Sequence, residues 1–237
     1  MKYRKLLNIY LLSLFSILML VRCSSQVENR PTSGPKMPAY SYYLNSSKYV
    51  ENQQYQKALV ALDTAIALKP EVSNFYFAKG QIYEIMGNKA EAIHEYENAL
   101  RYKSYHPDCW LKLASLYMDF DKPDRATQML KFLTEYRPDS LNYELMLADA
   151  YLADRKSTLA LDRVNYLEKQ GYQSEELNRI RGIAYYLQAD YKVAIEYLDK
   201  YVRQNPQNYK AQKYLGIAAL KAGMMEKGIS HLNKALA

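Results

Sequence analysis

Residues 107–140 read PDCWLKLASLYMDFDKPDRATQMLKFLTEYRPDS, and the spacing of their apolar and small residues recurs along most of the chain. If residue 39 is position 1 of a 34-residue repeat, further repeats begin at residues 73, 107, 141, 175 and 209 without insertion or deletion. Position 11 is tyrosine in the first five repeats, and positions 8 and 20 are small in all six. A fixed period of this length indicates a stack of similar supersecondary units.

Each repeat has the apolar spacing of two helices. In repeat two, Ala92, Ile93, Tyr96, Ala99 and Leu100 form one continuous apolar stripe on a helix. The small residues at positions 8 and 20 let the two helices of one repeat cross closely. Proline at position 32 of three repeats is expected to end the second helix. No segment alternates between apolar and polar residues, so we expect no β-sheet.

The pattern resembles the tetratricopeptide repeat (TPR), a helix-turn-helix unit of 34 residues. Repeat three carries the resemblance best, through Trp110, Ala114, Tyr117, Ala126 and Pro138. The resemblance covers residues 39–237 and implies an all-α fold, a right-handed superhelix (α-solenoid) of six TPR helix-turn-helix repeats. The implied repeats span residues 39–72, 73–106, 107–140, 141–174, 175–208 and 209–237.

In the TPR pattern, positions 2, 5, 9, 12 and 13 of the first helix line the inner surface of the superhelix. Acidic residues at these positions concentrate in the first four repeats and basic residues in the last two. This predicts a groove that holds an extended peptide or a partner helix, with charge setting its direction. The alternative is that these charges only solvate a surface. The candidate groove residues are Tyr40, Tyr43, Ser47, Phe77, Gln81, Glu84, Leu111, Asp119, Asp149, Arg179, Tyr186, Lys210 and Lys213.

One known TPR specialisation does not fit. TPR domains that hold the acidic C-termini of heat-shock chaperones use lysine at position 5 and asparagine at position 9 of the first repeat. Here these positions are Tyr43 and Ser47. We therefore do not expect docking to cytosolic chaperones.

The sixth repeat stops at position 29, without the extra polar helix that often closes such arrays. We expect apolar surface around Ile217, Leu220 and Ile229 to be incompletely covered. This end is then a contact surface for a partner or for a second copy of the chain.

Residues 1–22 have the features of an export signal, with a short basic region and a mostly apolar run at 6–21 that is short for a membrane span. Leu20-Val21-Arg22-Cys23 resembles the lipobox of bacterial lipoproteins. This resemblance implies a lipid on Cys23, a flexible tether at 23–38, and a body held at the outer membrane of a bacterial envelope, facing the periplasm. Arg22 departs from the small residue usual before the cysteine, which leaves open an uncleaved N-terminal anchor or an unmodified Cys23.

Composition argues against two other classes of function. The chain has 32 Lys+Arg and 25 Asp+Glu, but four of the basic residues lie within residues 1–22, so a nucleic-acid surface is not expected. His94, His106 and His231 lie far apart, and Cys109 is the only cysteine besides Cys23. The sequence has no phosphate loop and no hydrolase motif. We expect no enzyme, no metal and no cofactor; an enzyme hidden in a helical scaffold remains the rival hypothesis.

These features predict a non-catalytic, membrane-anchored scaffold that binds envelope proteins and supports assembly or localisation of an envelope complex. A lipid-anchored chain with six such repeats is similar to the type IV pilus pilotins, which help an outer-membrane secretin to assemble. It also resembles lipoprotein adaptors that recruit peptidoglycan hydrolases. The sequence leaves the choice among these open, together with self-association through the C-terminal end.

Overall fold

The computed structural model describes residues 38–236. The predicted signal peptide, Cys23 and all but the last residue of the tether lie outside this range. Within it, the chain forms twelve helices and no strand. The helices are α2 (Pro38–Glu51), α3 (Tyr55–Leu68), α4 (Ser73–Ile85), α5 (Lys89–Tyr102), α6 (Pro107–Asp119), α7 (Pro123–Tyr136), α8 (Leu141–Ala153), α9 (Ser157–Lys169), α10 (Glu175–Leu187), α11 (Tyr191–Gln204), α12 (Tyr209–Lys221) and α13 (Met225–Leu236).

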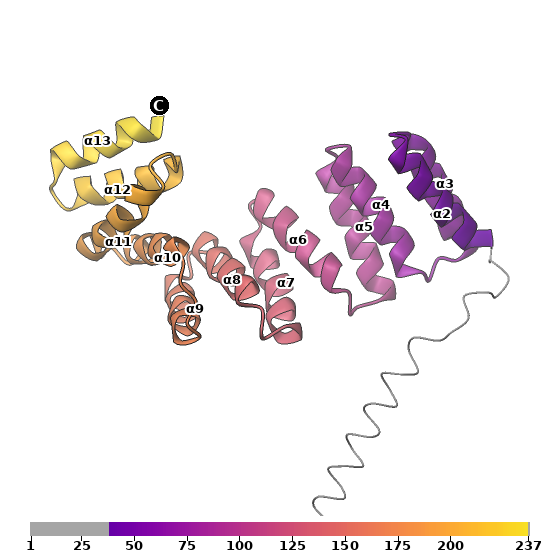
Figure 1. Ribbon diagram of the computed structural model, residues 1–237, viewed down its shortest axis with the longest axis horizontal. Helices are drawn as coiled ribbons and strands as arrows, with labels where there is room; N and C mark the ends of the chain where they lie inside the picture. Colours follow the sequence, from indigo (N-terminus) through magenta and orange to yellow (C-terminus); the bar gives the residue numbers. More distant parts are fainter. Residues whose placement is uncertain (1–37, 237) are drawn as a thin grey trace, which may run out of the picture.

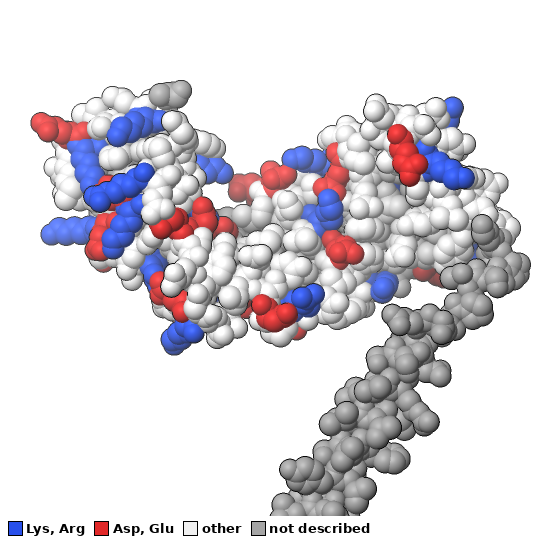
Figure 2. All heavy atoms as spheres, in the orientation of Figure 1, with Lys and Arg blue, Asp and Glu red and all other residues white. Residues whose placement is uncertain are grey.

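The helices form six consecutive hairpins, one in each 34-residue window. They stack side by side into a curved array, in which α2 and α13 lie at opposite ends (Figure 1). Figure 2 shows that one edge of this array is hollowed between its two ends. The predicted all-α solenoid is confirmed. No helix between residues 38 and 236 has the length and apolarity needed to cross a membrane.

Close crossing of the two helices in a hairpin depends on the small residue at position 8. A Cβ atom added to Gly80 would lie 2.6 Å from the Tyr96 ring, and one added to Gly182 would lie 2.5 Å from Leu198 Cγ. Both distances are shorter than van der Waals contact. The predicted role of position 8 is therefore confirmed where it is glycine.

The turn inside each hairpin places position 15 in the left-handed region of backbone space. Glycine occupies this position in repeats two and six, where Gly87 has φ 79° and Gly223 has φ 81°. The other four repeats put a residue with a Cβ atom there, at some cost in backbone strain. These residues are Gln53, Asp121, Arg155 and Ala189.

Proline ends the second helix of a hairpin as predicted. Helices α3, α7 and α11 end two residues before Pro70, Pro138 and Pro206. The buried apolar residues form two clusters, a small one in the first hairpin and α4 and a large one that runs from α4 to α12. The partly buried Ile66 and Tyr83 pack against both clusters. A solenoid of this kind leaves the seams between repeats as its main surface features.

Candidate partner-binding surfaces

The predicted groove begins with aromatic side chains that partly pack against one another. The rings of Tyr40 and Tyr43 both lie 5.4 Å from the ring of Phe75, between their centroids. Phe77 lies 4.8 Å from the His106 ring. These rings therefore pack against the chain on one side, while Tyr40 stays 44% exposed. Ser47 and Gln81 are exposed, whereas Leu111 is half-buried against the core.

Acidic residues of the predicted groove are paired with bases of a neighbouring repeat. Glu84 lies 3.0 Å from Lys112 Nζ and also accepts a hydrogen bond from the Tyr96 hydroxyl. Asp119 lies 2.6 Å from Lys89 Nζ. These pairs link adjacent repeats and partly neutralise the two carboxylates, although Asp119 remains about half exposed.

The third acidic residue, Asp149, is held by Arg179 of the next repeat. Arg179 donates to both Asp149 oxygens, at 2.7 and 2.8 Å, and also pairs with Glu176. Burial alone would lower the pKa of the Arg179 guanidinium, but the two carboxylates outweigh burial and raise it. This geometry is typical of a structural ion pair rather than of a free binding site.

The lysines at the basic end of the predicted groove, unlike its acidic residues, are left without ion-pair partners in the described chain. Lys210 and Lys213 are exposed and form no ion pair with any residue from 38 to 236. Tyr186 packs against Tyr214 at a centroid distance of 5.1 Å. The predicted gradient from acid to base therefore persists only at its basic end, because neighbouring repeats neutralise Glu84, Asp119 and Asp149.

The predicted C-terminal contact surface is only partly open. Ile229 is 51% exposed, as expected. Ile217 and Leu220 are half-buried, and Leu220 packs against the backbone of Gly228. Because the small residue at position 20 admits Leu220 into the hairpin, part of the Leu220 side chain packs inside the hairpin. Met225 and Leu236 are exposed on α13 and extend the surface that Ile229 begins.

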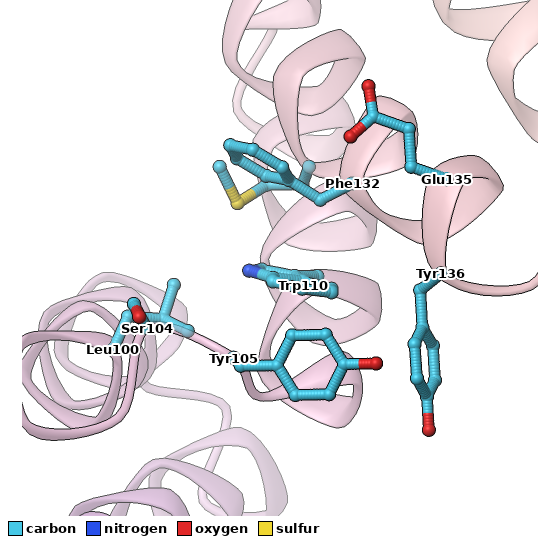
Figure 3. A pocket seen from close by; sticks show the side chains of 8 residues that line it. Leu100, Ser104, Tyr105, Trp110, Phe132, Glu135 and Tyr136 are labelled. Atoms are coloured by element: carbon cyan, nitrogen blue, oxygen red, sulfur yellow. The ribbon is translucent and has the colours of Figure 1, made fainter.

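An aromatic cleft that the sequence did not predict lies between repeats two and three. Its floor is Trp110, which is 6% exposed and has the Phe132 ring stacked on it at 5.3 Å. Tyr105 and Tyr136 meet edge to face at 5.0 Å beside it (Figure 3). The volume is about 600 Å³. The aromatic cleft is lined by Leu100, Ser104, Tyr105, Trp110, Met129, Phe132, Glu135 and Tyr136.

The rim of this cleft is unusually apolar for a surface. Tyr105 is 52% exposed and Phe132 is 45% exposed. Two features of the sequence point to this cleft. Ser104 stands at position 32, where three other repeats have proline. Phe132 is a large apolar residue of α7 that lies outside the buried stripe of that helix. Large rings held rigidly by neighbours are typical anchors of protein interfaces.

A basic cleft occupies the corresponding place between repeats five and six. Its volume is about 720 Å³. Lys227 pairs with Asp199, and the Gln212 amide donates to the Pro206 carbonyl at 2.8 Å. The basic cleft is lined by Asp199, Val202, Arg203, Pro206, Gln207, Gln212, Lys227, His231 and Lys234.

Six residues of one cleft match six of the other at a spacing of three repeats. Trp110 corresponds to Gln212, Phe132 to Lys234, and Met129 to His231. The remaining pairs are Leu100 with Val202, Ser104 with Pro206, and Tyr105 with Gln207. The fold therefore presents one structural slot twice, with aromatic side chains in one place and basic ones in the other.

Family models described as "Tetratricopeptide repeat" match residues 43–108, 85–150 and 180–237. The chain belongs to the tetratricopeptide repeat family. Among curated relatives, a TPR repeat-containing protein of Methanocaldococcus jannaschii is 26% identical over 206 residues. That alignment covers 83% of this chain but 36% of the relative, so the chain spans about a third of the relative's length.

Two solved structures share the TPR fold. A tetratricopeptide repeat protein from Parabacteroides merdae matches 84% of this chain and 79% of its own, with a TM-score of 0.68 and 14% identity. Pseudomonas aeruginosa pilF matches 82% of this chain and 88% of its own, with a TM-score of 0.53 and 16% identity. At these identities the likeness shows the fold alone.

The TPR body holds no constellation that favours catalysis within its described residues. Burial raises the pKa of the Cys109 thiol to about 12, with Asp108 adding to the shift, so the thiol is protonated at neutral pH. Residues 38–236 contain no group of three or more His, Cys, Asp or Glu side chains placed to hold a metal ion.

Proposed function

We propose that this chain is a non-catalytic adaptor of the bacterial cell envelope that binds a protein partner through its TPR body. The observation that carries the proposal is the aromatic cleft. Phe132 and Tyr105 are exposed, yet both rings are held by Trp110, so a partner side chain meets a rigid apolar surface. Little conformational entropy is lost when such a surface is covered.

The proposed anchor is a lipid on Cys23, based on the lipobox-like segment 20–23 and the basic and apolar segments before it. The tether would let the body stand away from the bilayer of the outer membrane. Radiolabelled palmitate is expected to enter the wild-type chain but not Cys23→Ser, and the wild type is expected to fractionate with membranes. An unlabelled wild type would reject lipidation, and a wild type found in the soluble fraction would reject anchoring altogether.

The adaptor role is tested by isolating the full chain from membranes after mild crosslinking. A specific envelope protein should accompany the wild type and be depleted in Phe132→Ser. Leu159→Ser is the matched control, because Leu159 is also an exposed apolar residue but lies on α9 outside both clefts. Equal recovery from both variants would reject the aromatic cleft as the anchor.

The alternative roles differ in the partner. A pilotin-like protein supports assembly of a secretin, and the fold shared with pilF is compatible with that role. Deletion would then reduce the heat-stable secretin multimer in outer membranes. An adaptor for peptidoglycan hydrolases would instead leave the secretin unchanged and alter hydrolase recovery with the membrane fraction.

Self-association through α13 is a further part of the proposal. Ile229 and Met225 are exposed on this helix, and exposed apolar side chains gathered on one helix are an interface candidate. Light scattering of the full chain in detergent is expected to show a dimer that Ile229→Glu dissociates. A monomeric wild type would reject it. Leu220 is unsuitable for this test because it packs inside the last hairpin.

A further inference from the structure

The basic cleft keeps positive charge that the described chain does not balance. Asp199 is its only carboxylate, and it pairs with Lys227. Arg203 and Lys234 are exposed and form no ion pair with any residue between 38 and 236. Two cations therefore remain on the walls of one cleft, Arg203 on α11 and Lys234 on α13.

This excess is a local departure from the rest of the body. In earlier repeats some bases pair with acids of a neighbouring repeat, as in the Lys79–Asp63 pair at 2.8 Å and the Arg125–Glu97 pair at 3.3 Å. Repeat six, in contrast, contains five lysines and one glutamate, whereas each of the other five repeats has a net charge between 0 and −1. Figure 2 shows Lys and Arg side chains gathered at this end of the array.

Hydrogen bonds fix the polar wall of the cleft. Gln212 is 2% exposed, and its amide nitrogen donates to the Pro206 carbonyl. Its amide oxygen therefore faces His231 Nδ1, at 2.7 Å, and accepts the proton of that nitrogen. This arrangement holds the imidazole in one orientation. The wall is consequently formed before any ligand arrives.

We propose that the basic cleft binds an acidic segment of the partner protein, whose carboxylates pair with Arg203 and Lys234. The proposal rests on the adaptor function and specifies the partner's chemistry. Arginine and lysine on opposite walls suit carboxylates spaced along a peptide, and a cleft of about 720 Å³ admits several side chains. The residues lie at positions 29 and 26 of second helices, not at the groove positions 5 and 9 of first helices.

The position of the cleft favours a protein segment over membrane lipid. The chain enters the body at α2, which follows the proposed tether, and the cleft lies at the opposite end of the array (Figure 1). If the chain is anchored to a membrane through residue 23, the intervening repeats separate that membrane from the cleft. A partner that reaches across the solenoid meets the cleft without needing to approach that bilayer.

The test uses the full chain in nonionic detergent and a fluorescent peptide of alternating glutamate and glycine. The cleft variant is Arg203→Gln with Lys234→Gln. The matched control is Lys131→Gln with Lys169→Gln, which removes the same charge from exposed residues outside the cleft. We expect the cleft variant to weaken binding roughly fivefold or more, because two exposed ion pairs are lost, and the control to weaken it less than about twofold.

Several outcomes would overturn the proposal. Equal losses in both variants would show attraction to net charge, and no loss in the cleft variant would remove Arg203 and Lys234 from the site. A peptide with glutamine in place of glutamate should not bind. Tighter binding of inorganic phosphate, or of monomeric dihexanoyl phosphatidylglycerol, would reassign the cleft to phosphate anions. Circular dichroism checks that the variants fold.

The adaptor proposal and this one fail separately. If the envelope partner is recovered equally well with the cleft variant and with the wild type, the adaptor function stands and the basic cleft has no part in it. If no envelope partner is recovered with the wild type but the glutamate peptide binds with the expected variant pattern, the cleft chemistry stands and the adaptor function does not.

Discussion

The aromatic cleft and the basic cleft occupy the same slot of the repeat but differ in how their walls are held. In the aromatic cleft the wall is the core itself, because Trp110 is both a buried framework residue and the floor of the cleft. In the basic cleft the buried floor is Gln212, held by two hydrogen bonds. The two seams open at the same place in the repeat but differ in side chains at positions 4 and 26, which are Trp110 and Phe132 in one and Gln212 and Lys234 in the other.

Position 4 divides the molecule into halves. It is aromatic in the first three repeats, as Tyr42, Tyr76 and Trp110. It is polar in the last three, as Glu144, Asn178 and Gln212. At this position the aromatic cleft has the ring contacts of Trp110, and the basic cleft has the hydrogen bonds of Gln212. The two clefts should therefore respond differently to truncation of this residue.

The largest expected difference is in the free energy of unfolding after truncation at position 4. Trp110→Ala removes a buried indole and its stacking on Phe132, and should cost about 3–5 kcal/mol. Gln212→Ala removes two hydrogen bonds and should cost about 1–3 kcal/mol. Urea unfolding followed by circular dichroism measures both. Equal costs would mean that the two seams are not stabilised by different forces.

Next in size is the effect of Phe132→Ser on partner affinity. Loss of a central aromatic contact costs about 2 kcal/mol or more in a typical interface, which is roughly 30-fold in Kd. Titration of the isolated partner against the full chain measures it, with Leu159→Ser as the control. A change below about threefold would show that the aromatic cleft is a structural seam and not a binding site.

Backbone strain in the hairpin turns gives a smaller effect. Ala189 has φ 63°, in the region where glycine is unstrained. Ala189→Gly is expected to stabilise the body by about 0.5–1 kcal/mol, because relief of strain exceeds the added entropy of the unfolded chain. The mirror substitution, Gly87→Ala in repeat two, should destabilise it by a similar amount. A loss of stability in Ala189→Gly would refute the strain at this turn.

The smallest expected effect is that of pH. Burial lowers the pKa of the His106 and His231 imidazoles, and nearby lysines add to both shifts. The unfolded chain therefore binds more protons as the pH falls below the ordinary histidine value of 6.5, so this stability is fully present above 6.5 and is lost as the pH falls from there through the lowered pKa values of the folded chain. Thermal unfolding on either side of that pH tests this. His106→Gln and His231→Gln should each weaken the dependence.

Lowering the pH should reduce the stability of the fold but raise the affinity of the basic cleft for an acidic ligand. Asp199, Arg203, Lys227 and Lys234 line the cleft around His231. A bound acidic segment would favour the protonated imidazole, so affinity for the glutamate peptide should rise as the pH falls toward the range where His231 titrates. The rise should be absent in His231→Gln, and its persistence there would assign it to another group.

Most of the fold followed from the sequence because its repeat pattern is local. The small residue at position 8 and the proline at position 32 each act within one hairpin or at its end, as Gly80 and Pro70 illustrate. Because the six repeats begin at a constant spacing of 34 residues, neighbouring hairpins can stack in few ways. The strain at Ala189 could not be inferred from the residue type, since alanine normally avoids this conformation.

The binding surfaces were less predictable because they depend on contacts between repeats. The predicted groove charges Glu84, Asp119 and Asp149 are neutralised by bases about one repeat away in sequence. Leu220 was expected on an open surface but fits against Gly228. The aromatic cleft needed Tyr105, Trp110 and Phe132 to meet from three elements. The change from aromatic to polar residues at position 4 was visible in the sequence. Its link to the two clefts became apparent only from the contacts between repeats.

In-cell photocrosslinking of the full chain tests the central claim most directly, that the aromatic cleft holds an envelope partner. A photoreactive benzoyl-phenylalanine would replace Phe132 in one strain and Leu159 in another. A discrete higher-mass adduct with an envelope protein is expected from position 132 and none from position 159. No adduct from position 132, or the same adducts from both positions, would contradict it.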